Sequence, residues 1–221
     1  IAHWEDALPD YLHLAYLPAP NIVRLRLSAY DVDRKQATED IEAQFNMLRE
    51  IIGDNIVGYE GSTVEAQLHD ILLKRGKTLA VAESCTGGII ASKFTAMAGA
   101  SAYFRGGVVA YANEAKRDIL GVRMEDIECF GAVSEVVALE MAEGVRRITG
   151  ADYAIATTGI AGPTGGSAEK PVGTVWIAWA MPEGTIAKCF HFGVAREREQ
   201  ITQRAVTAAL VELIKSLNTK Q

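Results

Sequence analysis

The chain has 221 residues, of which 49% are hydrophobic and 23% are charged, and its formal net charge is −6. This composition is typical of a soluble globular protein with an ample core, and the negative charge argues against nucleic acid as a partner. No apolar run could cross a membrane and no signal segment opens the chain, so we expect a cytoplasmic protein without a membrane partner. The three cysteines lack metal-like spacing, which predicts reduced thiols and no metal site.

Residues 1–59 are predicted to form a small α+β domain. Residues 21–30 alternate apolar and polar side chains like a half-buried strand, and the apolar residues of 37–52 share one helical face. Residues 54–59 predict a short closing strand. KH-like RNA-binding modules contain related elements, but no Gly-x-x-Gly loop with flanking basic residues is present, so packing or spacing is the role we expect.

Residues 60–221 alternate strands and helices, which predicts an α/β fold, a three-layer sandwich with a mixed sheet. A helix over 64–75 is expected to begin at Ser62 or Thr63 and to end at Gly76. The remaining periodicity predicts strands over 79–82, 107–111, 153–157, 173–180 and 186–192, and helices over 89–97, 113–120, 134–149 and 197–216.

A polar turn separates the strand over 79–82 from the helix that follows it. The turn contains a carboxylate, two hydroxyls, a thiol and two glycines: Glu83, Ser84, Cys85, Thr86, Gly87 and Gly88. Strand-to-helix turns of this kind usually bind an anion or a reacting carbonyl in α/β proteins. Further polar clusters occupy residues 99–101, 111–116, 157–167 and 193–198. Because loops at the carboxyl ends of strands converge, these clusters predict one small-molecule site.

The chain contains neither the P-loop motif nor the dinucleotide-binding turn, so we expect no ATP or NAD cofactor. A serine nucleophile needs a base, yet every histidine lies outside the polar clusters: His3, His13, His69 and His191. A lysine can replace histidine in a dry site that lowers its pKa. Lys116, one helical turn after Ala112, is the best candidate, and a solvated surface lysine is the alternative interpretation.

Other polar residues of these clusters have two interpretations each. Tyr111 and Asn113 either relay a proton and hold an amide oxygen, or they pack at the strand end and cap a helix. Cys85 could be a nucleophile, but no neighbouring histidine would make it a thiolate. Glu83 either balances local charge or binds a ribose.

Five segments, in order, resemble the C-terminal domain of the CinA family: residues 82–88, 109–116, 131–135, 159–163 and 170–175. The resemblance runs from about Val64 to Leu217 and implies hydrolysis of the carboxamide of nicotinamide mononucleotide, giving nicotinate mononucleotide and ammonia. It implies a homodimer that needs neither metal nor cofactor. Residues before Tyr59 resemble the KH-like linker domain of longer CinA proteins. Their molybdopterin-binding-like domain is missing, and the chain opens at Ile1 without a methionine, so we expect a fragment.

The resemblance also implies a serine and lysine mechanism, for which Ser84 and Ser101 compete as nucleophile. We favour Ser101, because it can neighbour the strand end that carries Tyr111, the proton relay, and Lys116, the base. The loop around Ser84 would then hold the nucleotide. The expected substrate-binding residues are Glu83, Thr86, Gly87, Gly88, Asn113, Thr158, Gly159 and Arg198.

Two alternatives remain open at this point. Residues 193–198 lack the Gly-Asp-Arg pattern expected before the last helix, so either Arg196 or Arg198 is the phosphate ligand. A non-catalytic module that binds a nucleotide, or that takes part in competence or damage-related interactions, would use the same fold without turnover.

Overall fold

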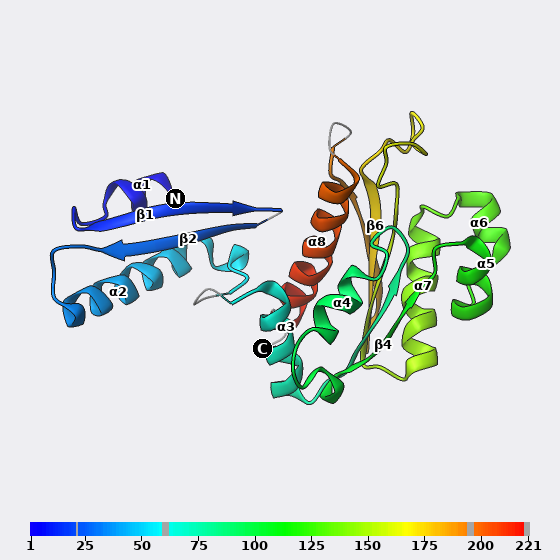
Figure 1. Cartoon of the computed structure of the whole chain (residues 1–221), viewed down its shortest axis with the longest axis horizontal. Helices are drawn as coiled ribbons and strands as arrows, with labels where there is room; N and C mark the ends of the chain where they lie inside the picture. Colours follow the sequence, from blue (N-terminus) through cyan, green and yellow to red (C-terminus); the bar gives the residue numbers. More distant parts are fainter. Residues whose placement is uncertain (21, 59–61, 194–196, 219–221) are drawn as a thin grey trace. The chain divides into compact units, whose positions relative to one another are not determined.

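The computed structural model describes residues 1–20, 22–58, 62–193 and 197–218. The chain divides into two compact units, Ile1–Gly61 and Ser62–Gln221 (Figure 1). Among the described residues, no helix combines the length and the apolar character needed to cross a membrane.

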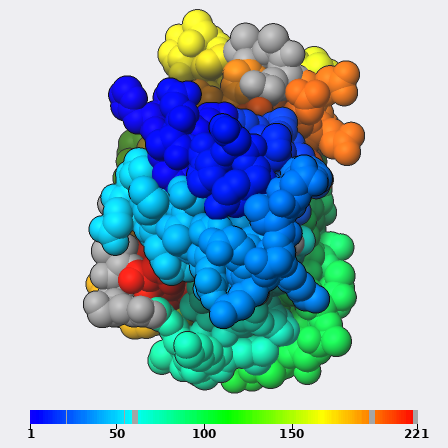
Figure 2. Space-filling model, turned by 90° about the vertical axis from the view of Figure 1, so that its left-hand side faces the viewer, coloured from blue at the N-terminus to red at the C-terminus, as the bar shows by residue number. Residues whose placement is uncertain are grey.

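The first unit is a β-hairpin that packs with two helices, and Figure 2 looks onto its surface, coloured blue to cyan. Its elements are α1 (Ala2–Asp6), β1 (Leu12–Ala19), β2 (Ile22–Ala29), α2 (Arg34–Ile52) and the 3-10 turn η1 (Gly53–Asn55). The antiparallel strands pair Leu14 with Leu27, and the buried core contains Trp4, Leu27 and Leu48.

One expectation for this unit is wrong. Residues 53–55 form a 3-10 turn, and residues 56–58 lie in no strand. β2 pairs instead with β1, whose signal was obscured by Pro18 and Pro20 at its end. The KH-like character of this unit stays a prediction.

The second unit follows the predicted alternation closely. Its elements are α3 (Val64–Arg75), β3 (Leu79–Glu83), α4 (Ile89–Thr95), η2 (Ala100–Ala102), β4 (Phe104–Val109), α5 (Asn113–Ala115), the π-helical turn η3 (Lys116–Leu120), α6 (Met124–Phe130), α7 (Glu135–Thr149), β5 (Tyr153–Gly159), β6 (Thr174–Met181), β7 (Gly184–His191) and α8 (Arg198–Asn218). The predicted helix caps are confirmed where Thr63 accepts a hydrogen bond from the Ala66 N–H and Gly76 ends α3 with a φ of 60°. α6 is an element that periodicity did not reveal, since its seven residues span only two turns.

The five strands form a mixed sheet in the order β4-β3-β5-β6-β7. β3 runs parallel to both of its neighbours, while β6 is antiparallel to β5 and β7. α7 packs along one face of the sheet, and α4 and α8 pack on the other face, with α3 against α8 (Figure 1). The predicted three-layer α/β sandwich is therefore confirmed.

Small side chains let α7 lie close to the sheet. The strands contribute alanines to this contact, and α7 packs against them with an apolar face. The buried cluster includes, from the strands, Ala80, Ala82, Ala154, Ala156 and Ala178, and, from α7, Ala138, Met141, Ala142 and Val145. Burial of this apolar surface contributes roughly 25 cal/mol per Å². Because β3, β4 and β5 run parallel, their carboxyl ends meet at one edge of this core, and the loops that follow them lie together there.

Candidate functional site

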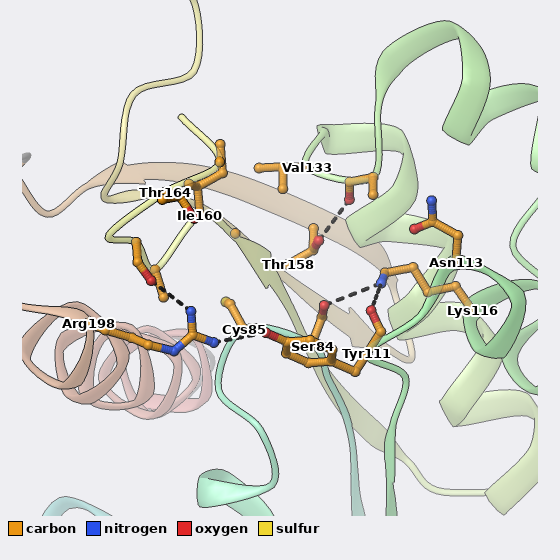
Figure 3. Close-up of a pocket in the computed structure, with 15 residues that line it drawn as sticks. Ser84, Cys85, Tyr111, Asn113, Lys116, Val133, Thr158, Ile160, Thr164 and Arg198 are labelled. Atoms are coloured by element: carbon orange, nitrogen blue, oxygen red, sulfur yellow. Dashed lines mark hydrogen bonds between the residues drawn. The ribbon is translucent and has the colours of Figure 1, made fainter. Parts of the chain in front are cut away.

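A cavity of about 320 Å³ lies at this edge of the sheet (Figure 3). The volume is at the lower end of the range, about 300 to 1,000 Å³, that holds small-molecule ligands. Its walls come from the ends of β3, β4 and β5, the start of α8 and the loops between them: Ser84, Cys85, Tyr111, Asn113, Lys116, Ala132, Val133, Thr158, Gly159, Ile160, Ala161, Gly162, Thr164, Gly165 and Arg198.

Ser84 and Lys116 face each other in this cavity. Lys116 Nζ lies 3.3 Å from Ser84 Oγ and 3.2 Å from the Tyr111 carbonyl oxygen (Figure 3). It also lies 3.0 Å from the Ala110 carbonyl oxygen. The lysine side chain is almost completely buried, with 1% of the residue exposed. The sequence-predicted base is therefore no surface lysine, and its closest hydroxyl partner is Ser84.

Burial lowers the pKa of the Lys116 amine below its ordinary value, because the charged form loses hydration. Cys85 and Glu114 oppose this shift more weakly. Among the described residues, no carboxylate forms an ion pair with Lys116. In its neutral form the amine donates its two hydrogens to the two carbonyls, and its lone pair is left for the Ser84 hydroxyl. This is the arrangement that a general base requires.

A close contact between α7 and the π-helical turn η3 positions Lys116, the first residue of that turn. A Cβ atom on Gly144 of α7 would lie 2.1 Å from the Leu120 carbonyl oxygen, so a larger residue would collide with the turn. Arg147, one turn further along α7, donates to the same carbonyl at 3.1 Å. Such π-helical turns are frequent at functional sites.

The placement of Ser101 beside Lys116 is wrong. Ser101 is exposed in η2, before β4 begins, and two residues later the Tyr103 carbonyl accepts the N–H of Leu79 at the start of β3. Ser84 follows the other end of the same strand. At about 3.3 Å per residue, the two serines lie roughly 15 Å apart. Ser101 was expected to neighbour the strand end that carries Tyr111 and Lys116, but strand direction puts it at the edge away from the cavity.

Glu83 is a structural residue of the corner that precedes α4. The side chain is fully buried, and its carboxylate accepts the N–H groups of Gly88, Ile90 and Ala91 at 3.0, 3.1 and 2.8 Å. These are the donors that a bound anion would otherwise use at the start of α4. The expectation that Glu83 binds substrate is therefore corrected: it holds the turn that presents Ser84.

The other residues of this turn also have structural roles. Thr86 is buried, and its hydroxyl lies 2.7 Å from that of Thr157 on β5. Gly87 and Gly88 adopt φ values of 62° and 96°, in the left-handed region that favours glycine. These three residues do not line the cavity. They shape the corner, whereas the resemblance to the CinA family implied that they contact the substrate.

Four of the predicted binding residues do line the cavity: Asn113, Thr158, Gly159 and Arg198. Arg198 opens α8 and donates to the Gly162 carbonyl at 2.9 Å and to the Tyr111 hydroxyl at 3.0 Å (Figure 3). Arg198 is thus the cationic side chain at the mouth of the cavity. The alternative, Arg196, lies outside the described residues.

Cys85 lines the cavity beside Ser84, but its chemistry argues against attack. Burial raises the pKa of the Cys85 thiol to about 12, so it stays protonated at neutral pH. None of the four histidines lines the cavity. Within the described part of the chain, no three His, Cys, Asp or Glu side chains gather as a metal site would need.

The cavity also has apolar lining that the polar clusters did not predict. Ala132 and Val133 form it on one side, and the Thr158 hydroxyl donates to the Ala132 carbonyl at 2.7 Å to hold that loop in place. Ile160, directly after β5, also lines the cavity. The polar clusters drew attention to the charged and hydroxyl residues, and only the position of these loops shows that their apolar neighbours face the same space.

The known proteins to which this chain is similar agree with one another in family. The model of the CinA C-terminal domain matches residues 61–217. A CinA-like protein of Flavobacterium psychrophilum is 46% identical over 218 residues, which are 98% of this chain and 52% of that protein. A putative competence-damage inducible protein of Desulforudis audaxviator is 41% identical over 208 residues, 94% of this chain and 50% of that protein. The chain therefore spans about half the length of these relatives.

Solved structures agree with the second unit. The crystal structure of the competence damage-inducible protein A from Klebsiella pneumoniae superimposes with a TM-score of 0.68 at 41% identity, covering 72% of this chain and 97% of that one. A competence/damage inducible protein from Agrobacterium tumefaciens gives a TM-score of 0.66 at 42% identity, covering 73% and 99% of the two chains.

Proposed function

The chain belongs to the CinA family of competence/damage-inducible proteins, and from this membership and its cavity we propose that it is an amidohydrolase with Ser84 as nucleophile and Lys116 as base. The substrate that we propose is nicotinamide mononucleotide, which would be converted to nicotinate mononucleotide and ammonia. The observation that carries the proposal is the 3.3 Å approach of the buried Lys116 amine to the Ser84 hydroxyl.

The first half of the reaction forms an ester on Ser84. Neutral Lys116 takes the hydroxyl proton as Ser84 Oγ bonds to the carboxamide carbon. The resulting tetrahedral species collapses with cleavage of the C–N bond. Tyr111 gives its hydroxyl proton to the departing nitrogen, which leaves as ammonia, and the Lys116 ammonium returns a proton to Tyr111.

The second half hydrolyses the ester. Lys116, neutral again, takes a proton from water, and the oxygen of that water bonds to the ester carbon. As the carbon–Oγ bond breaks, Lys116 returns its proton to Ser84. The sum is one amide and one water converted to one carboxylic acid and one ammonia, so no metal or redox partner is needed for the balance.

The remaining walls suit a nucleotide that carries a carboxamide. Arg198 provides a positive charge at the start of α8, where the helix dipole also favours a phosphate. Asn113 supplies the side-chain amide among the lining residues, which can pair with the substrate carboxamide. Val133 and Ile160 offer apolar surface to the pyridine ring. The phosphate, the carboxamide and the pyridine ring thus each have a chemical counterpart in the cavity.

The test is direct. Purified protein is incubated with nicotinamide mononucleotide while ammonia is measured, with and without a chelator. We expect ammonia release that the chelator leaves unchanged. Binding of the nucleotide without ammonia release would instead support the non-catalytic module, and loss of activity with chelator would contradict the metal-free mechanism.

A further inference from the structure

Arg198 makes a contact that a simple phosphate ligand would not need. Its Nη2 atom lies 3.0 Å from the Tyr111 hydroxyl oxygen, and its Nη1 atom donates to the Gly162 carbonyl at 2.9 Å (Figure 3). The guanidinium is therefore held between the loop after β5 and Tyr111, two residues after the end of β4. All three of these residues line the cavity.

The direction of the contact with Tyr111 is fixed by chemistry. A guanidinium has donors and no acceptor, so the Tyr111 oxygen must accept this hydrogen bond. The hydroxyl hydrogen of Tyr111 is consequently free to be donated to another group.

The Tyr111 side chain has little else to hold it. The residue is 63% exposed, while its main-chain carbonyl is tied to Lys116 Nζ at 3.2 Å. Its backbone is thus fixed to the base, but an exposed tyrosine ring is free to change rotamer unless its tip is restrained. The Arg198 guanidinium provides that restraint.

We propose that Arg198 is a positioning residue for catalysis, which holds the Tyr111 hydroxyl as proton donor to the departing nitrogen, in addition to any contact with phosphate. This inference rests on the proposed amidase function. It predicts that Arg198 matters for turnover even when the substrate has no phosphate.

Nicotinamide riboside separates the two roles, because it carries the carboxamide and the ribose but no phosphate. We expect Arg198→Ala to lower kcat on the riboside roughly tenfold, the size expected for one lost charge-assisted hydrogen bond. The double variant Tyr111→Phe with Arg198→Ala should turn over the riboside no more slowly than Tyr111→Phe alone, because both changes remove one interaction. An unchanged kcat in Arg198→Ala would overturn the proposal and leave Arg198 as a phosphate ligand.

Two further variants serve as controls. Arg198→Lys keeps the charge but cannot bridge two acceptors as a planar fork does. We expect it to recover KM for the nucleotide in part while kcat on the riboside stays low. Arg105→Ala removes an exposed arginine from β4, outside the cavity, and should leave both constants unchanged.

A spectroscopic measurement tests the contact without turnover. With tyrosines labelled with carbon-13 at Cζ, the Tyr111 signal is assigned by its loss in Tyr111→Phe. The signal should move in Arg198→Ala and stay in place in Arg105→Ala. A signal that Arg198→Ala leaves unmoved would contradict the proposal, whereas absence of ammonia release from the wild-type protein would contradict the amidase function itself.

Discussion

The proposed role of Lys116 follows from its burial, which disfavours the charged form of its amine. A buried ammonium loses hydration, and among the described residues no carboxylate pairs with this one to compensate. The carbonyl oxygens of Ala110 and Tyr111 satisfy two hydrogens and orient the nitrogen toward Ser84. The same burial that disfavours the charge thus prepares the amine to accept a proton.

The pH dependence of turnover follows from this burial. Because the reaction needs the neutral amine, the logarithm of kcat/KM should rise with pH with a slope of about one, and it should level off above the pKa of Lys116. Burial places the midpoint below the ordinary lysine value of 10.5. Measuring kcat/KM for ammonia release across the stable pH range checks this.

Lys116→Arg is the matched control for the pH profile, because arginine stays charged and cannot act as a base. We expect it to be inactive at every pH. Activity that rises with pH in this variant would show that another group is titrating.

The two serines make opposite predictions. Ser84→Ala should lower kcat by about 10³-fold or more, because the attacking oxygen is removed. Ser101→Ala, at an exposed position outside the cavity, should keep kcat and change the free energy of unfolding by less than about 0.5 kcal/mol. The measurements are steady-state ammonia release and denaturant unfolding; loss of activity in Ser101→Ala alone would reverse the assignment.

At the scale of elements, α7 determines where the base stands. This helix packs along the sheet and meets the Leu120 carbonyl through Gly144, which has no side chain to separate them. Lys116 begins the turn that ends at Leu120. Although no residue of α7 lines the cavity, this helix therefore helps to set the geometry of the site.

Gly144→Ala should push α7 away from the Leu120 carbonyl. The added Cβ collides with backbone that cannot yield like a flexible side chain, so we expect a loss of about 1 to 3 kcal/mol in the free energy of unfolding. We expect kcat to fall as well, because the turn carries Lys116 with it. Gly53→Ala, where an added Cβ meets nothing within 4 Å, is the control that should change neither quantity. An unaltered kcat in a destabilised Gly144→Ala variant would contradict the claim that the packing of α7 positions Lys116 for catalysis.

At the scale of the whole chain, every residue that lines the cavity belongs to the unit Ser62–Gln221. The structure from Klebsiella pneumoniae is covered to 97% by a match that takes up 72% of this chain, so a chain of about this unit alone folds in a relative.

We therefore expect a protein of residues 62–221 to fold and to release ammonia from nicotinamide mononucleotide with kcat and KM within about twofold of the full chain. The two proteins would be compared by circular dichroism and by steady-state kinetics. A folded but inactive 62–221 protein would show that residues 1–61 contribute to the reaction.

Much of the second unit could be predicted from the sequence because its signals are local. Apolar periodicity, the caps at Thr63 and Ser134, and the glycine at the end of α3 each act within one element. The first unit was harder to predict. Its strand β2 pairs with β1, and periodicity within one segment does not say which partner it has.

The sequence by itself determined the α/β architecture, the family and the set of polar residues from which the site is built, because these depend on residue types in order along the chain. Only the tertiary structure decided which of them meet. Strand direction brings Ser84 to Lys116 and carries Ser101 to the opposite edge, and the fully buried carboxylate of Glu83 occupies the start of α4. Distances between residues far apart in sequence arise from packing, and they decide the chemistry of this site.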